Sequence, residues 1–200
     1  GGTLTVANAN VLRGDTQLIV GAPDQSGRTN IGGVVYLPQA QSYTGQTIVG
    51  ASGILQVGTD GALSTGNNTI KLMGGDLRVS LAAGIWGGVD TQYANRNLEI
   101  ASGNSTFRTS SLSGGSYGRV TLNNISIYDS ERVFSVNTIG TLFTDVAVNN
   151  ITFVNTAASA INQYLDVGFD NSFQAGAGML TVNGVISQTG VAAVNLQKRQ

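Results

Sequence analysis

The chain has 200 residues and a mass of 20.6 kDa; charged residues make up 10% of it, and histidine and cysteine are absent. Typical soluble domains carry about 25% charged residues, so the polar surface here is built mainly from uncharged groups. Without histidine, Ser-His-Asp and Cys-His catalysis and histidine zinc sites are excluded, and without cysteine so are disulfides and thiolate metal sites. Because the net charge is −1 and no basic cluster occurs, we expect no nucleic-acid partner.

Short strands are predicted along the whole chain, because most aliphatic triplets have a polar centre and end near Gly, Asn, Asp or Ser. In chain order, the triplets are Leu4–Val6, Leu18–Val20, Leu55–Val57, Ile70–Leu72, Leu77–Val79, Leu98–Ile100, Val120–Leu122 and Leu165–Val167. The alternation predicts a buried and a solvent-facing side for each strand, with Gln56, Lys71, Arg78 and Glu99 facing solvent. Residues 156–165 are the best candidate for a helix.

The inward aliphatic residues recur at an interval of about 21 residues. The series is Val35, Leu55, Leu77, Leu98, Val120, Leu142, Leu165 and Val185. Such a period, with several strands in each, is typical of a parallel β-solenoid, where equivalent residues of successive turns stack into ladders. The sequence therefore predicts an all-β fold, a parallel β-solenoid of about nine turns with this series as its structural ladder. A β-sandwich is the alternative, but hairpin signals are few.

A group of motifs between residues 32 and 103 resembles the autotransporter-associated β-strand repeat, also called the passenger-associated transport repeat. Its core is Tyr43–Gly45, Thr47–Val49, Ser52–Gly53, Leu55–Gly58 and Asp60–Leu63, and an echo follows at residues 179–198. The resemblance implies a right-handed parallel β-helix that a Gram-negative or related bacterium exports to its cell surface or surroundings. Residues 104–178 are less regular. We expect residues 1–200 to form one β-solenoid segment, cut from a longer chain.

Two features of this chain are expected to hold turns together. The ring of Tyr43 would pack at the solenoid edge, and Gly45 would supply a turn conformation closed to other residues. The pairs Asn123-Asn124 and Asn149-Asn150 would stack through amide hydrogen bonds along the axis.

Exposed aromatic residues are the candidates for a binding surface. Trp86, Tyr93 and Tyr117 could form a contact patch for a glycan or a protein on a loop between strands. The alternative is that Trp86 covers an apolar edge of the solenoid.

Paired carboxylates are the only candidates for catalysis, because glycoside hydrolysis needs two of them. Asp129 and Glu131, Asp166 and Asp170, or Asp145 and Asp166 one turn apart could form such a pair. The alternative, that all are solvated charges, is favoured because no histidine, no trio of basic residues and no aromatic platform accompanies them. The sequence therefore predicts no catalytic residue, no metal site and no cofactor.

Taken together, these patterns favour a non-enzymatic, structural or adhesive β-helix segment of a bacterial surface protein. We expect an extracellular location, a host-surface or glycan receptor, and self-association end to end into filaments, because solenoid ends carry unpaired strands. No apolar run approaches about 18 residues, so no transmembrane segment is expected. The alternative from another class is a carbohydrate-active β-helix, a polysaccharide lyase, hydrolase or phage tailspike that uses Asp clusters.

Overall fold

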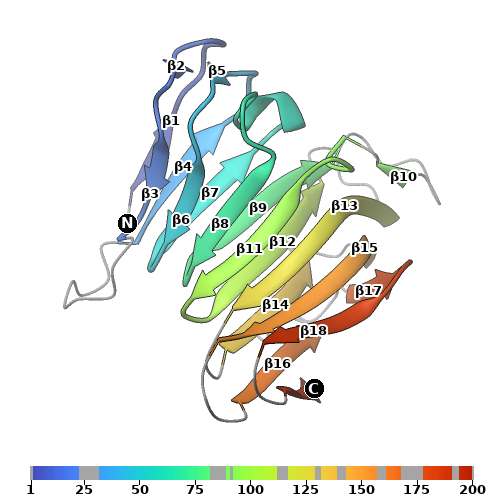
Figure 1. Ribbon diagram of the computed structural model, residues 1–200. Helices are drawn as coiled ribbons and strands as arrows, with labels where there is room; N and C mark the ends of the chain where they lie inside the picture. Colours follow the sequence, from blue (N-terminus) through green and yellow to red (C-terminus); the bar gives the residue numbers. More distant parts are fainter. Residues whose placement is uncertain are drawn as a thin grey trace.

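The computed structural model describes residues 2–22, 32–81, 89–90, 92–111, 117–128, 132–138, 143–156, 161–167, 178–190 and 194–199. These residues form an all-β fold with parallel pairing between strands (Figure 1). The eight predicted triplets all lie in strands, except that Val6 follows directly after its strand. The helix candidate at 156–165 is wrong, because its described C-terminal half belongs to a strand, β16 (Ile161–Val167).

Two large sheets contain almost all of the strands. The first sheet has the order β1 (Thr3–Thr5), β4 (Gly33–Leu37), β7 (Gly53–Val57), β9 (Asp76–Leu81), β12 (Ser105–Ser111), β14 (Arg132–Thr138), β16 and β19 (Val194–Arg199). The second sheet contains β3 (Leu18–Val20), β6 (Thr47–Gly50), β8 (Thr69–Met73), β11 (Asn97–Ser102), β13 (Tyr117–Tyr128), β15 (Phe143–Asn155) and β17 (Gly178–Val182), with β10 (Val89–Asp90) pairing with β13 and β18 (Ile186–Gly190) with β15. A small sheet joins β2 (Arg13–Gly14) to β5 (Ser42–Tyr43).

The chain passes repeatedly from one large sheet to the other, so strands that follow each other along a sheet are far apart in sequence. Figure 1 shows the resulting stack, which runs from the N-terminal strands at one end to the C-terminal strands at the other. One hydrophobic cluster holds inward residues from both sheets, such as Leu55 and Phe107 from the first and Leu72 and Ile127 from the second. The core therefore lies between the two sheets.

The inward residues form a separate ladder in each sheet. In the first sheet, the aligned inward residues are Val35, Leu55, Leu77 and Phe107, and the backbone alignment continues to Leu4 at one end and to Val136 and Val167 at the other. In the second sheet, Val20, Val49, Leu72, Ile100, Ile127 and Phe153 are aligned in the same way. Side chains that repeat at one position of successive parallel strands stack directly on each other, which gives the core its continuity.

The predicted ladder is therefore correct only from Val35 through Leu55 to Leu77. Leu98 and Val120 belong to the second sheet, and Leu165 is aligned with Phe134 and Lys198, one row away from Val167. Val185 lies between β17 and β18 and is 62% exposed, and Leu142 lies outside the described residues. The physical reason is that strands of both sheets have the same alternation of inward aliphatic and outward polar residues. The series predicted from the sequence therefore combined residues of the two sheets.

The spacing within the first sheet agrees with the predicted interval only in part. The steps from Val35 to Leu55 and from Leu55 to Leu77 match the predicted period of about 21 residues. The next partner of Leu77 is Phe107, and Phe107 pairs in turn with Val136, so both of these later steps are clearly longer. In this sheet, the regular interval is thus restricted to the part of the chain that carries the repeat-like motifs.

Candidate functional site

A charged cleft on the outer face of the first sheet is the candidate site. Asp76 and Arg78 stand on β9, and Thr106 and Arg108 occupy the aligned positions on β12. Because side chains alternate along a strand, the burial of Leu77, Val79 and Phe107 in the core turns these four side chains outward.

The two arginines share one carboxylate oxygen. Nε of Arg78 lies 2.9 Å from Oδ2 of Asp76, and Nε of Arg108 lies 3.2 Å from the same atom. The three side chains are only 13–23% exposed. Two positive charges directly opposite each other repel, and the Asp76 carboxylate between them reduces this repulsion.

The cleft beside this cluster has a volume of about 440 Å³. Its remaining wall is formed by four glycines and three other residues: Gly32, Gly53, Gly74 and Gly75, with Ser52, Ile54 and Asn104. Gly75 is required by close approach, because a Cβ atom there would lie 2.6 Å from the carbonyl oxygen of Gly50. Chemically, the cleft offers guanidinium N–H groups, which suit planar oxyanions, beside hydroxyl and amide groups.

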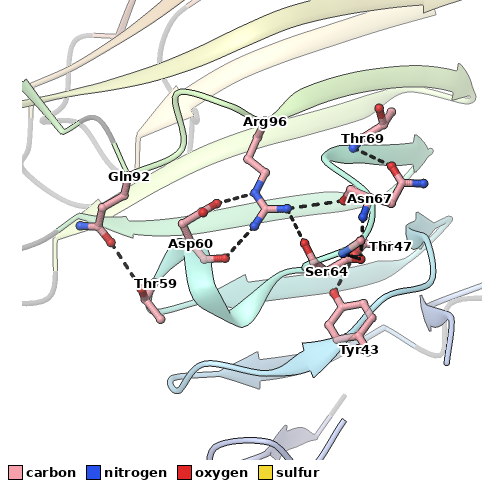
Figure 2. A network of polar contacts seen from close by, with 10 residues as sticks. Tyr43, Thr47, Thr59, Asp60, Ser64, Asn67, Thr69, Gln92 and Arg96 are labelled. Atoms are coloured by element: carbon pink, nitrogen blue, oxygen red, sulfur yellow. Dashed lines mark hydrogen bonds and ion pairs between the residues drawn. The ribbon is translucent and has the colours of Figure 1, made fainter. Parts of the chain in front are cut away.

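A second polar cluster, around Arg96, fastens the 3-10 turn η1 (Asp60–Ala62) to the second sheet (Figure 2). Nε of Arg96 donates to Oδ1 of Asp60 at 2.5 Å, and its Nη atoms donate to the carbonyl oxygens of Asp60 at 3.1 Å and of Ser64 at 2.7 Å. Arg96 is 5% exposed, so this cation is almost fully enclosed by its partners. The arrangement positions a loop and leaves no surface for a ligand, which makes its role structural.

Tyr43 lies beneath the same loop and is completely buried. Its hydroxyl oxygen is 2.6 Å from Oγ1 of Thr47, and burial raises the pKa of the Tyr43 phenol above its ordinary value of 10.0. The ring is thus part of the interior and not of the edge. Gly45 is needed for close packing and not for its backbone angle, because a Cβ there would lie 2.5 Å from the carbonyl oxygen of Thr16.

The predicted asparagine stacking is confirmed. Nδ2 of Asn124 donates to Oδ1 of Asn97 at 3.2 Å, and Nδ2 of Asn150 donates to Oδ1 of Asn124 at 2.9 Å. The row continues to the backbone N–H of Val185, which donates to Oδ1 of Asn150. A parallel row links Asn149 to Asn123 and Asn123 to Asn97. These amides hold successive turns of the chain together.

The predicted aromatic patch is not assembled by the described residues. Tyr93 is 1% exposed and belongs to the hydrophobic core, so the prediction that it binds at the surface is wrong. Its position beside the Arg96 loop places the ring inside, which local sequence does not reveal. Tyr117 lies on β13, aligned with Phe143 of β15, and Trp86 lies outside the described residues.

The candidate pair of Asp145 and Asp166 is not brought together. Asp145 lies on β15 of the second sheet and is aligned with Arg119, whereas Asp166 lies on β16 of the first sheet, aligned with Ser135. Asp129, Glu131 and Asp170 lie outside the described residues. Within the described part of the chain, no three acidic residues gather in a group that could hold a metal ion.

Sequence reasoning placed Arg78 on a solvent-facing side but missed the cleft, because Arg78 and Arg108 are far apart in the sequence and their pairing carries no local signal.

Comparisons with family models, with curated proteins and with solved structures find no match for this chain. Among the described residues, no helix is long and apolar enough to cross a membrane.

Proposed function

We propose that the chain is a segment of a right-handed parallel β-helix that acts as a structural and adhesive element of a bacterial surface protein, outside the cell and without enzymatic activity. The observation that carries the proposal is the continuous parallel pairing of the first sheet from β1 to β19. Eight strands at a spacing of about 4.8 Å place the first and the last strand about 34 Å apart. Hydrogen bonds and stacked side chains along such a stack resist bending and extension.

The resemblance of residues 32–103 to the passenger-associated transport repeat supports the location and the handedness. The lack of cysteine is compatible with folding outside the cell, because a chain of this length can build its core without a disulfide. A surface with few charges also permits close contact with neighbouring molecules.

End-to-end association is part of the proposal. β1 and β3 end the two sheets on one side, and β19 and β17 end them on the other. Aliphatic side chains are exposed at both ends: Leu4 and Ile19 near the first, and Met179, Val185 and Ile186 near the second. Because the strands pair in parallel, the last strands of one copy can pair with the first strands of the next without reversal. Such head-to-tail contacts build an open filament when the rotation between copies does not close a ring.

Electron microscopy of the purified chain over a concentration series tests this proposal. We expect rods that join into longer filaments as the concentration rises, and L4K should prevent the joining by placing a charge in the apolar end. S126K is the matched control, because Ser126 faces outward in the middle of the second sheet. Compact particles without an elongated axis would contradict the rod, and rods of one length at every concentration would contradict the association.

A further inference from the structure

We propose that Asn183 is a site of spontaneous deamidation, and that hydrogen bonds to β15 set its rate by holding the backbone of Gly184 and Val185. Asn183 and Gly184 lie in the turn between β17 and β18, and both are exposed. They form the only Asn-Gly pair in the sequence. The modification stands apart from the proposed function, and only its consequence for end-to-end association rests on that function.

Deamidation joins the side-chain amide of an asparagine to the backbone nitrogen of the next residue. The nitrogen of Gly184 loses its proton and attacks Cγ of Asn183, so that a new C–N bond closes a succinimide ring. The C–N bond of the side-chain amide breaks, and the amino group leaves with the proton as ammonia. Water then opens the ring at either carbonyl and gives aspartate or isoaspartate. Asparagine is thermolabile for this reason, and glycine as the next residue hinders the attack least because it has no Cβ atom.

The two reacting groups are in different environments. Asn183 is exposed, so water has access to its side chain. The N–H of Gly184, in contrast, donates to the carbonyl oxygen of Asn149 on β15 at 2.7 Å. A nitrogen that donates in this way keeps its proton and points at its acceptor, so it can attack Cγ only after this hydrogen bond opens.

The next residue is held as well. The N–H of Val185 donates to Oδ1 of Asn150 at 2.9 Å, and the N–H of Ile151 donates to the carbonyl oxygen of Val185 at 3.0 Å. Asn150 is itself fixed, because its Nδ2 donates to Oδ1 of Asn124 at 2.9 Å. The asparagine row therefore ends on the backbone of this turn and keeps it against β15.

The same close approach explains why an Asn-Gly pair is present. A Cβ atom at Gly184 would lie 2.6 Å from both the carbonyl oxygen of Asn149 and Oδ1 of Asn150, so only glycine fits there. The turn thus requires the residue that makes Asn183 most reactive, and the contacts that require it also supply the hydrogen bonds that restrain the reaction.

Deamidation would change the apolar end of the stack. It places a carboxylate beside Val185, which is 62% exposed, and Ile186, and isoaspartate also adds a methylene group to the backbone of the turn. If this end joins the next copy, as proposed above, the joint would have to bury the new charge, which is costly. The modified chain should therefore no longer join at this end.

Peptide mapping by mass spectrometry tests the inference on the dilute chain at mildly alkaline pH. A synthetic peptide of residues 180–187 is the reference, because nothing restrains its glycine. We expect Asn183 of the folded chain to deamidate about 30-fold more slowly than the peptide, since two hydrogen bonds of ordinary net strength have to open. Equal rates in the chain and the peptide would overturn the restraint. Absence of aspartate and isoaspartate at position 183 after about 100 peptide half-lives would overturn the site.

Three variants identify the contact that matters. N150A removes the acceptor of the Val185 N–H and should accelerate the reaction about fivefold. N149A is the matched control: it loses a side-chain hydrogen bond to Asn123 but keeps the carbonyl oxygen that Gly184 uses, so it should react at the wild-type rate. N183S has no reacting amide and should give no product. Equal acceleration in N149A and N150A would refute the role of the Asn150 side chain, and the comparison of the wild-type chain with the peptide needs no variant to fold.

Electron microscopy of N183D and N183S tests the consequence for association. N183D carries the charge of the product and should stay as separate rods, whereas the neutral N183S should join into filaments as the wild-type chain does. Filaments of N183D would overturn the effect on joining. The two proposals fail separately: restrained deamidation in a chain that never forms filaments would overturn the association alone, and filaments of a chain that does not deamidate would overturn this inference alone.

Discussion

Replacing Arg96 by methionine tests whether one buried cation holds the loop after β7 in place. Arg96 is 5% exposed and bonds to the Asp60 carboxylate and to the carbonyl oxygens of Asp60 and Ser64 (Figure 2). Methionine keeps the length of the apolar stem but removes every donor. Ser64 is completely buried, so its carbonyl oxygen would stay without that donor, whereas the Asp60 side chain is 30% exposed and water can reach it.

The expected loss follows from these exposures. Breaking a fully buried ion pair on one side costs about 3–5 kcal/mol, and the partial hydration of Asp60 places R96M at the lower end, about 3 kcal/mol. For a chain of this size, that corresponds to a decrease of Tm by about 6–12 °C. D60N is the matched control: it removes the ion pair but keeps the bonds from Arg96 to the carbonyl oxygens of Asp60, Ser64 and Asn67, and we expect a loss of about 1 kcal/mol.

Hydrogen exchange locates the effect. The amide of Leu63 donates to the carbonyl oxygen of Asp60 at 3.0 Å, and the amide of Thr65 donates to that of Tyr43 at 2.9 Å. A local loss of about 3 kcal/mol should accelerate exchange at both amides about 100-fold in R96M, with less change in β15. If Tm fell by less than about 2 °C, or if Leu63 and Thr65 exchanged as in the wild type, Arg96 would not fasten the loop.

Three further predictions concern the interior. N124A removes two amide hydrogen bonds of the asparagine row and should lower the free energy of unfolding in urea by about 1–2 kcal/mol. N149A removes one exposed hydrogen bond and should lower it by less than about 0.5 kcal/mol. Equal losses in the two variants would contradict the stabilising role of the row. Because burial raises the pKa of the Tyr43 phenol in the folded state, the protonated phenol stabilises the folded chain below pH 10.0, and this stabilisation is lost as the pH rises through the folded-state pKa. Y43F should therefore show a flatter decrease of Tm at alkaline pH than the wild type. Identical Tm profiles of the two proteins would contradict the raised pKa. G75A places a Cβ 2.6 Å from Gly50 O and should cost about 1–3 kcal/mol, while G2A, with open space, should unfold at the wild-type urea concentration.

The strands could be predicted from sequence because alternation is a local property. Leu55 and Val57 are completely buried and Gln56 between them is partly exposed, as the triplet indicates. The asparagine rows could be predicted for a similar reason, since an Asn-Asn pair that recurs further along the chain marks equivalent positions. In each case, the signal lies in a few neighbouring residues or in one interval.

The assignment of strands to sheets could not be predicted, because it depends on the lengths of the connections. Leu77 and Leu98 follow each other at the predicted interval and have the same pattern, yet they lie in different sheets. The burial of Tyr93 could not be predicted either. The residues around it have the composition of a surface loop, and only the packing of that loop against the core buries the ring. The candidate cleft combines both problems, since it depends on register between distant strands.

The distribution of charge in this fold follows from its geometry. Equivalent side chains on neighbouring parallel strands stand about 4.8 Å apart, so a repeated charge would repel its copy in every turn. Neutral amides avoid this cost, and they form the rows from Asn97 to Asn150. Opposite charges also avoid it, as Lys71 and Glu99 do. Arg78 and Arg108 are like charges in aligned positions, and the Asp76 carboxylate lies 2.9 Å from Nε of the first and 3.2 Å from Nε of the second. A carboxylate in contact with both cations lowers the repulsion between them, as an opposite charge on the neighbouring strand does for Lys71.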